Sequence, residues 1–109
     1  FLKTLNKYRS RKIIGYGASA RAQTFINFCD ISVSDIKLII DNNPLKHKKF
    51  TPKNSIPIVS LKDGLKTKPD IIVILAWNFE KEIINSLKKN RFKGKIIRPF
   101  PNKIKTYLI

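Results

Sequence analysis

The sequence of 109 residues predicts an α/β fold in which one parallel sheet lies between two layers of helices. Short apolar runs alternate with longer segments in which apolar residues recur every three or four positions, as strands and helices alternate in βαβ units. One run, residues 71–75, is apolar at every position, which is typical of a central parallel strand covered on both faces. These observations predict a three-layer α/β/α domain with about five parallel strands.

The first half of the chain is expected to contain three strands and one amphipathic helix. Residues 12–15 form a short strand, residues 36–40 a second, and residues 56–59 a third. Pro57 lacks an amide donor and therefore places the third strand at an edge of the sheet. Between the first two strands, one helix face carries Ala18, Ala22, Phe25, Ile26 and Cys29.

The second half is expected to add two strands and two helices. Ser60 can cap a short helix over residues 61–65, and the central strand 71–75 follows it. Residues 95–98 form the last strand. With no internal repeat and no linker, residues 1–109 are interpreted as a single domain. The longer helix before the last strand has acids at its start and lysines at its end, and its buried face would carry Phe79, Ile83, Ile84 and Leu87.

Composition excludes several classes of function. Residues 71–77 form the longest unbroken apolar run, which is far shorter than the roughly 20 residues that a membrane span needs. A single cysteine, Cys29, cannot form an internal disulfide, and no cluster of Cys and His could hold a metal. No apolar N-terminal segment resembles a secretion signal, so we expect a cytoplasmic protein without a membrane partner.

The formal net charge of +16 raises the question of nucleic-acid binding. Eighteen of the 23 basic residues are lysines, and only residues 46–49 form a dense basic cluster. Nucleic-acid modules usually add arginines for base edges and exposed aromatic rings for stacking, whereas most phenylalanines here fall at expected core positions. We therefore interpret the charge as a bias of composition that is compatible with attraction of a diphosphate, and nucleic acid is not an expected partner.

The chain contains no methionine and begins with Phe1. A natural translation product normally starts with methionine, so we expect this sequence to be one domain of a longer protein, with a processed N-terminus as the alternative. On this interpretation the domain acts together with a partner domain.

A glycine-rich segment, residues 15–20 (GYGASA), fits the pattern G-x-G-x-x-A between a strand and a helix, as in Rossmann folds. In that interpretation Gly15 permits a tight turn and Gly17 leaves room for a phosphate. Free amides of the first helical turn then face the anion, and the Ser19 hydroxyl adds a donor. The alternative is a glycine-rich turn needed only to pack the helix on the strand. A half Rossmann fold also predicts the strand order 3-2-1-4-5.

Asp41 ends the second predicted strand, where a dinucleotide-binding fold places an acid that binds a ribose diol. Alternatively, Asp41 only caps the turn into Asn42, Asn43 and Pro44, which its short side chain does well. The two interpretations remain open.

A third loop, directly after the central strand, holds Trp77 and Asn78. Trp77 offers a flat face for a base or a sugar, and Asn78 offers both a donor and an acceptor. Alternatively, Trp77 covers the sheet and Asn78 caps the next helix. In the predicted strand order the three loops follow neighbouring strands, so they border one crevice at the carboxyl ends of the strands.

Five motifs occur in order along the chain, at residues 15–21 (GYGASAR), 41–46 (DNNPLK), 50–52 (FTP), 56–58 (IPI) and 74–79 (ILAWNF). Together they resemble the C-terminal domain of the sugar C-methyltransferase family, whose members depend on S-adenosylmethionine. The resemblance runs over roughly residues 12–101. Family members usually have Lys-Gly where this chain has Arg21-Ala22, and glycines near Lys49 and Lys53 are also replaced.

The resemblance implies a larger enzyme that methylates a carbon of a keto-sugar carried on a nucleoside diphosphate. In this family a zinc-binding N-terminal segment and a methyltransferase domain precede the Rossmann-like domain. S-adenosylmethionine and the catalytic base belong to the methyltransferase domain. This chain is therefore expected to bind no cofactor and to be non-catalytic alone, which agrees with its seven acids and single histidine.

We therefore expect this domain to bind the nucleoside-diphosphate sugar together with the upstream methyltransferase domain of the same protein. The alternative is a free-standing Rossmann module that binds a dinucleotide or a nucleotide sugar. A third hypothesis, a nucleic-acid-binding module, is supported by the charge alone. The residues expected to bind the substrate are Gly15, Tyr16, Gly17, Ala18, Ser19, Arg21, Asp41, Asn42, Asn43, Lys46, Trp77 and Asn78.

Overall fold

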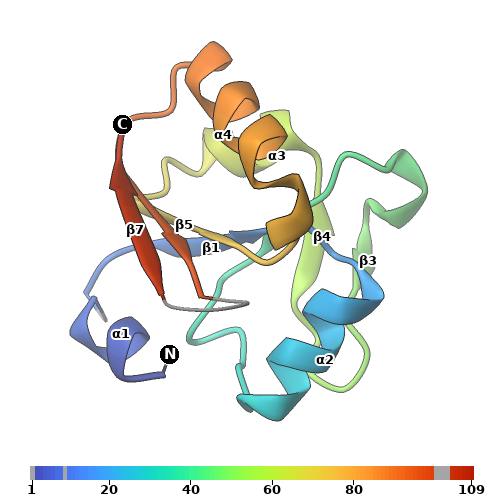
Figure 1. Ribbon diagram of the computed structural model, residues 1–109. Helices are drawn as coiled ribbons and strands as arrows, with labels where there is room; N and C mark the ends of the chain where they lie inside the picture. The colour runs from blue at the N-terminus through green and yellow to red at the C-terminus, as the bar shows by residue number, and fades with distance from the viewer. Residues whose placement is uncertain (1, 9, 100–103) are drawn as a thin grey trace.

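A seven-stranded sheet runs through the middle of the computed structural model, which describes residues 2–8, 10–99 and 104–109 (Figure 1). Within the described residues the strands lie in the order β3-β4-β2-β1-β5-β6-β7. Their bounds are β1 (Ile13–Tyr16), β2 (Ile39–Ile40), β3 (Lys49–Phe50), β4 (Pro57–Val59), β5 (Ile71–Ile74), β6 (Lys95–Arg98) and β7 (Lys105–Leu108). The helices are α1 (Leu2–Lys7), α2 (Ala20–Phe28), α3 (Leu61–Lys66) and α4 (Glu80–Lys89), with two short 3-10 helices, η1 (Pro44–Lys46) and η2 (Trp77–Phe79).

The strands β4, β2, β1, β5 and β6 are mutually parallel, and β1 lies at their centre. The sheet as a whole is mixed, because β3 pairs with β4 and β7 pairs with β6 in antiparallel fashion. The α/β class is confirmed, but the expected parallel sheet of about five strands in the order 3-2-1-4-5 is only the middle of a larger mixed sheet. The strand with Pro57, β4, was expected at an edge and lies instead between β3 and β2. The connections over residues 51–56 and 99–104 are too short for a parallel crossover, which takes a dozen or more residues.

Helices cover both faces of the sheet, so the molecule has three layers (Figure 1). The pleat of β1 separates the two cores, because Ile13 packs on the face covered by α1 and α2, whereas Ile14 packs on the face covered by α3 and α4. Over the described part of the chain, no helix combines the length and the apolar character that crossing a bilayer requires.

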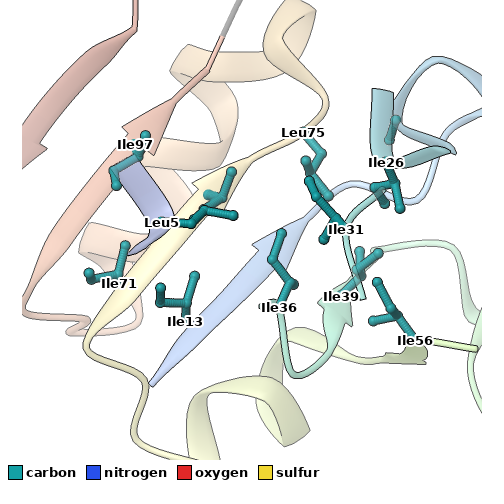
Figure 2. Packing of buried hydrophobic residues seen from close by; sticks show 12 residues of the cluster. Leu5, Ile13, Ile26, Ile31, Ile36, Ile39, Ile56, Ile71, Leu75 and Ile97 are labelled. Carbon is teal, nitrogen blue, oxygen red and sulfur yellow. The ribbon is translucent and has the colours of Figure 1, made fainter. Parts of the chain in front are cut away.

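Isoleucine dominates the core between the sheet and the helices α1 and α2. Branching at Cβ favours strands, where these side chains pack well on the pleated surface. Burying one such side chain stabilises the fold by about 1.5–3 kcal/mol before entropy is counted. Figure 2 shows this cluster, whose labelled members are at most 3% exposed: Leu5, Ile13, Ile26, Ile31, Ile36, Ile39, Ile56, Ile71, Leu75 and Ile97.

The two long helices largely follow their predicted apolar faces. In α2, Ala22 and Ile26 are buried, while Phe25 and Cys29 pack half-buried at the edge of the core. In α4, the predicted face is correct except at its start. Phe79 precedes the helix, in η2, and is 55% exposed, so its assignment to the core is wrong.

Candidate ligand-binding pocket

A pocket of about 380 Å³ opens at the carboxyl ends of β1, β2 and β5. Because β1 lies between β2 and β5, the loops that follow these three strands face one another there. Eight of the twelve predicted site residues line this pocket, whereas Gly15, Arg21, Trp77 and Asn78 do not. The full lining is Tyr16, Gly17, Ala18, Ser19, Asp41, Asn42, Asn43, Lys46, Ala76, Phe79 and Ile83.

Gly15 and Gly17, at the end of β1 and just after it, both lie close against neighbouring side chains. Gly17 has a φ of +104°, and a Cβ there would lie 2.4 Å from the Cβ of Ala76. Gly15 lies within β1 rather than in the turn, and a Cβ there would lie 2.8 Å from Cδ1 of Leu75. The space that side chains at these two positions would occupy is therefore filled by Leu75 and Ala76. This geometry favours the packing interpretation over the one in which Gly15 forms a turn and Gly17 admits a phosphate.

Asp41 connects the loops after β1 and β2. Its Oδ2 accepts a hydrogen bond from the Ala18 amide at 2.7 Å, and its Oδ1 accepts one from the Asn43 amide at 2.8 Å. Lys46 Nζ donates to the Ala18 carbonyl at 2.7 Å and lies 4.0 Å from Asp41 Oδ2. Each carboxylate oxygen thus accepts one backbone hydrogen bond, so Asp41 forms the loop, and each keeps a second lone pair that can still accept a hydrogen bond.

Two asparagines complete the polar side of the pocket. The hydroxyl of the buried Tyr16 donates to Asn42 Oδ1 at 3.0 Å. This contact orients the exposed Asn42 side chain and leaves its amide nitrogen as a donor for a ligand. The neighbouring Asn43 accepts a hydrogen bond from the Leu45 amide at 3.0 Å, so its side-chain oxygen caps η1.

The start of α2 lies directly beside the pocket. Ser19 is its N-cap, and Ser19 Oγ accepts from the Ala22 amide at 3.1 Å. The first amides of a helix have no intrahelical acceptor, and the helix dipole makes this end positive. Together with the ammonium of Lys46, this gives the pocket one positive side.

Arg21, Trp77 and Asn78 lie next to the pocket rather than in its lining. The Arg21 guanidinium stands 5.7 Å from the centre of the Trp77 ring, so the two side chains form a cation–π contact between α2 and η2. Asn78 is exposed, and the N-cap position of α4 is held by Phe79. The alternative in which Asn78 caps this helix is therefore wrong.

The apolar side of the pocket consists of Ala76, Phe79 and Ile83. Sequence reasoning selected the loop after the central strand by its position, but it chose Trp77 and Asn78 from that loop instead of Ala76 and Phe79. Phe79 and Ile83 are four residues apart, and this spacing fits a helix packed on a sheet as well as it fits a pocket wall, so periodicity could not separate the two roles.

The pocket thus has a polar, positive side and an apolar side. Such a site suits a ligand that joins an anionic or hydroxyl-rich group to a ring. Among the described residues, no three His, Cys, Asp or Glu side chains gather where they could hold a metal ion.

The chain forms a Rossmann-like α/β domain with a pocket at the carboxyl ends of its parallel strands. The chain belongs to the C-methyltransferase C-terminal domain family, whose model matches residues 1–101, and the expected family is thereby confirmed. C-methyltransferase NovU of Streptomyces niveus is 32% identical over 92 residues, which cover 84% of this chain. The match covers 22% of that relative, so the chain spans less than a quarter of its length.

A solved structure has a similar fold. UDP-D-quinovosamine 4-dehydrogenase from Vibrio fischeri matches with a TM-score of 0.58 and 22% sequence identity, over 91% of this chain and 94% of that chain. At this identity the likeness concerns the fold alone, and it agrees with the Rossmann-like arrangement described above.

Proposed function

We propose that this domain binds the nucleoside-diphosphate sugar substrate of a sugar C-methyltransferase. The observation that carries the proposal is a two-sided pocket at the carboxyl ends of β1, β2 and β5 in a chain of the C-methyltransferase C-terminal domain family. An upstream methyltransferase domain of the same protein completes the site and supplies the catalytic base. The cytoplasm stays the predicted location.

The two sides of the pocket match the two kinds of group in such a substrate. Lys46 uses one of its three donors on the Ala18 carbonyl, which leaves two for a phosphate oxygen. Asn42 adds an amide donor on the same side. The exposed Phe79 ring offers an apolar surface to a base or a sugar ring.

S-adenosylmethionine carries no phosphate for Lys46 to bind and its sulfonium is a cation, so it suits this pocket less well than a nucleoside-diphosphate sugar. The cofactor is therefore proposed to bind the methyltransferase domain.

An NMR titration of the isotope-labelled domain tests the proposal. One side of a site binds weakly, so we expect a Kd near millimolar, or about 4 kcal/mol, for a deoxythymidine-diphosphate sugar. The largest amide shifts are expected at Gly17, Asn42 and Phe79, and S-adenosylmethionine is expected to cause none. The titration uses moderate salt, which suppresses nonspecific attraction by the charge of +16.

Two controls make the titration specific. Lys46→Gln should weaken binding several-fold, whereas Lys53→Gln, which removes an exposed lysine, should not change it. A parallel titration with inorganic pyrophosphate measures the shifts that any polyanion causes through nonspecific electrostatic attraction. Equal shifts with pyrophosphate, spread over the lysines, would contradict the proposal. Tighter binding of a dinucleotide than of the nucleotide sugar would instead support a free-standing dinucleotide-binding module.

A further inference from the structure

The C-terminal strand β7 lies outside the stretch that the family model matches, residues 1–101. It forms an edge of the sheet, where it pairs with β6 from Lys95 opposite Leu108 to Arg98 opposite Lys105 (Figure 1). Gly94 and Ile109 extend this pairing, since each amide donates to the other residue's carbonyl at 2.9–3.0 Å. The chain thus adds an ordered strand to the matched domain.

Glu80, the first residue of α4, contacts β6 and β7 at once. Its Oε1 accepts a hydrogen bond from Arg98 Nη1 at 3.0 Å, which forms an ion pair with β6. Its Oε2 accepts a hydrogen bond from the Tyr107 hydroxyl of β7. The side chains of Glu80 and Arg98 are 17% and 18% exposed, so solvent screens this pair only in part.

The same glutamate is attached to the apolar side of the pocket. Its amide donates to the Trp77 carbonyl, which closes η2 just after the pocket residue Phe79. Ile83, the next pocket residue on this side, is buried in the first turn of α4. Contacts that hold Glu80 in place therefore also hold Phe79 and Ile83 in place.

We propose that Tyr107 is a positioning residue, which holds the apolar side of the pocket in place through Glu80. Arg98 keeps one carboxylate oxygen on β6, and the Tyr107 hydroxyl keeps the other on β7. When the hydroxyl is lost, the start of α4 and η2 separate from the sheet more often. Strand β7 thereby acts on the pocket without lining it.

Amide hydrogen exchange of the Tyr107→Phe variant tests this role. Exchange at residues 77–83 should rise roughly tenfold, because the variant loses a hydrogen bond to a charged group. Exchange at residues 24–28 of α2, on the other face of the sheet, should change by less than about twofold, because local opening of these amides leaves the contact between Tyr107 and Glu80 intact. Amides of β1 that exchange only by global unfolding should rise as well, because global unfolding breaks the same hydrogen bond. The measurement needs no ligand, so its failure is distinct from failure of the proposed substrate binding.

Two further variants complete the experiment. Tyr8→Phe is the matched control, because Lys95 Nζ donates to the Tyr8 hydroxyl at 2.6 Å at the opposite end of β6, and exchange at residues 77–83 should stay unchanged. Glu80→Gln should raise exchange at least as much as Tyr107→Phe, because it also removes the ion pair with Arg98, and adding Tyr107→Phe to Glu80→Gln should change little. Unchanged exchange at residues 77–83 in Tyr107→Phe, or an equal rise at residues 24–28 of α2, would overturn the proposal.

Discussion

Gly17 and Ala76 set the distance between the loops that follow β1 and β5. In the Gly17→Ala variant, the φ of +104° strains the alanine backbone, and the new Cβ would lie 2.4 Å from the Cβ of Ala76, which is a steric clash. We expect a loss of about 3 kcal/mol in the free energy of unfolding, combining the cost of a left-handed alanine with that of overpacking. Urea denaturation followed by circular dichroism measures it.

The double variant Gly17→Ala/Ala76→Gly separates the two causes. It removes the Cβ that alanine meets at 2.4 Å but not the backbone nitrogen of residue 76 at 2.9 Å, so it should recover only part of the loss that comes from the clash and keep the part that comes from φ. A loss below about 1 kcal/mol in the single variant would mean that the loop relaxes away from β5 at little cost.

Asp41 joins the loops that follow β1 and β2. The Asp41→Asn variant replaces one of the two carboxylate oxygens, which are both hydrogen-bond acceptors, with an amide group that donates. The variant leaves either the Ala18 or the Asn43 amide without its partner, so we expect a destabilisation of about 2 kcal/mol. The control is Asp30→Asn, which also removes one acid, at an exposed site whose positive φ asparagine tolerates. Equal losses in the two variants would show that only net charge matters.

These residues also mark how far the candidate site was predictable from the sequence. Gly17, Asp41 and Lys46 line the pocket, and glycine patterns and strand ends are the local signals that pointed to them. Their roles were less predictable, since the atom opposite Gly17 belongs to Ala76, far along the chain. Phe79 was assigned to the core because apolar spacing does not show which side of a helix start faces solvent.

At the scale of elements, strands buried on both faces were predictable and edge strands were not. The run around β5 is apolar throughout because helices cover it on both sides. The edge strands β3 and β7 are largely exposed and contain lysines, so no apolar run in the sequence predicts them. Their pairing depends on neighbours that only the folded sheet supplies.

Helix α1 and strand β6 are linked by a contact with a measurable pH signature. Lys95 donates to the Tyr8 hydroxyl, and this hydrogen bond, more than any other cause, lowers the pKa of Tyr8 from 10.0. The phenol of Tyr8 should therefore ionise at lower pH than an ordinary tyrosine, because the ammonium favours the phenolate. Phenolate absorbance during alkaline titration records the step. Persistence of that early step in Tyr8→Phe would assign it to another tyrosine.

At the scale of the whole molecule, repulsion among like charges opposes folding. The chain carries 23 basic and 7 acidic residues, so most charges meet others of the same sign. Raising the ionic strength from roughly 0.01 to 0.15 M shortens the Debye length from about 30 to 8 Å. We expect the free energy of unfolding by urea to increase over this range. A decrease would show that attractive pairs such as Glu80 with Arg98 outweigh the repulsion.

Ala18 is held from two sides by the loop after β2, at its amide by Asp41 and at its carbonyl by Lys46. A ligand that enters the pocket therefore meets backbone whose dihedral angles folding has already restricted. Ordering a flexible residue costs roughly 1–2 kcal/mol of conformational entropy. Here that cost belongs to folding and not to binding, so a ligand that contacts Ala18 loses no affinity to the ordering of this residue.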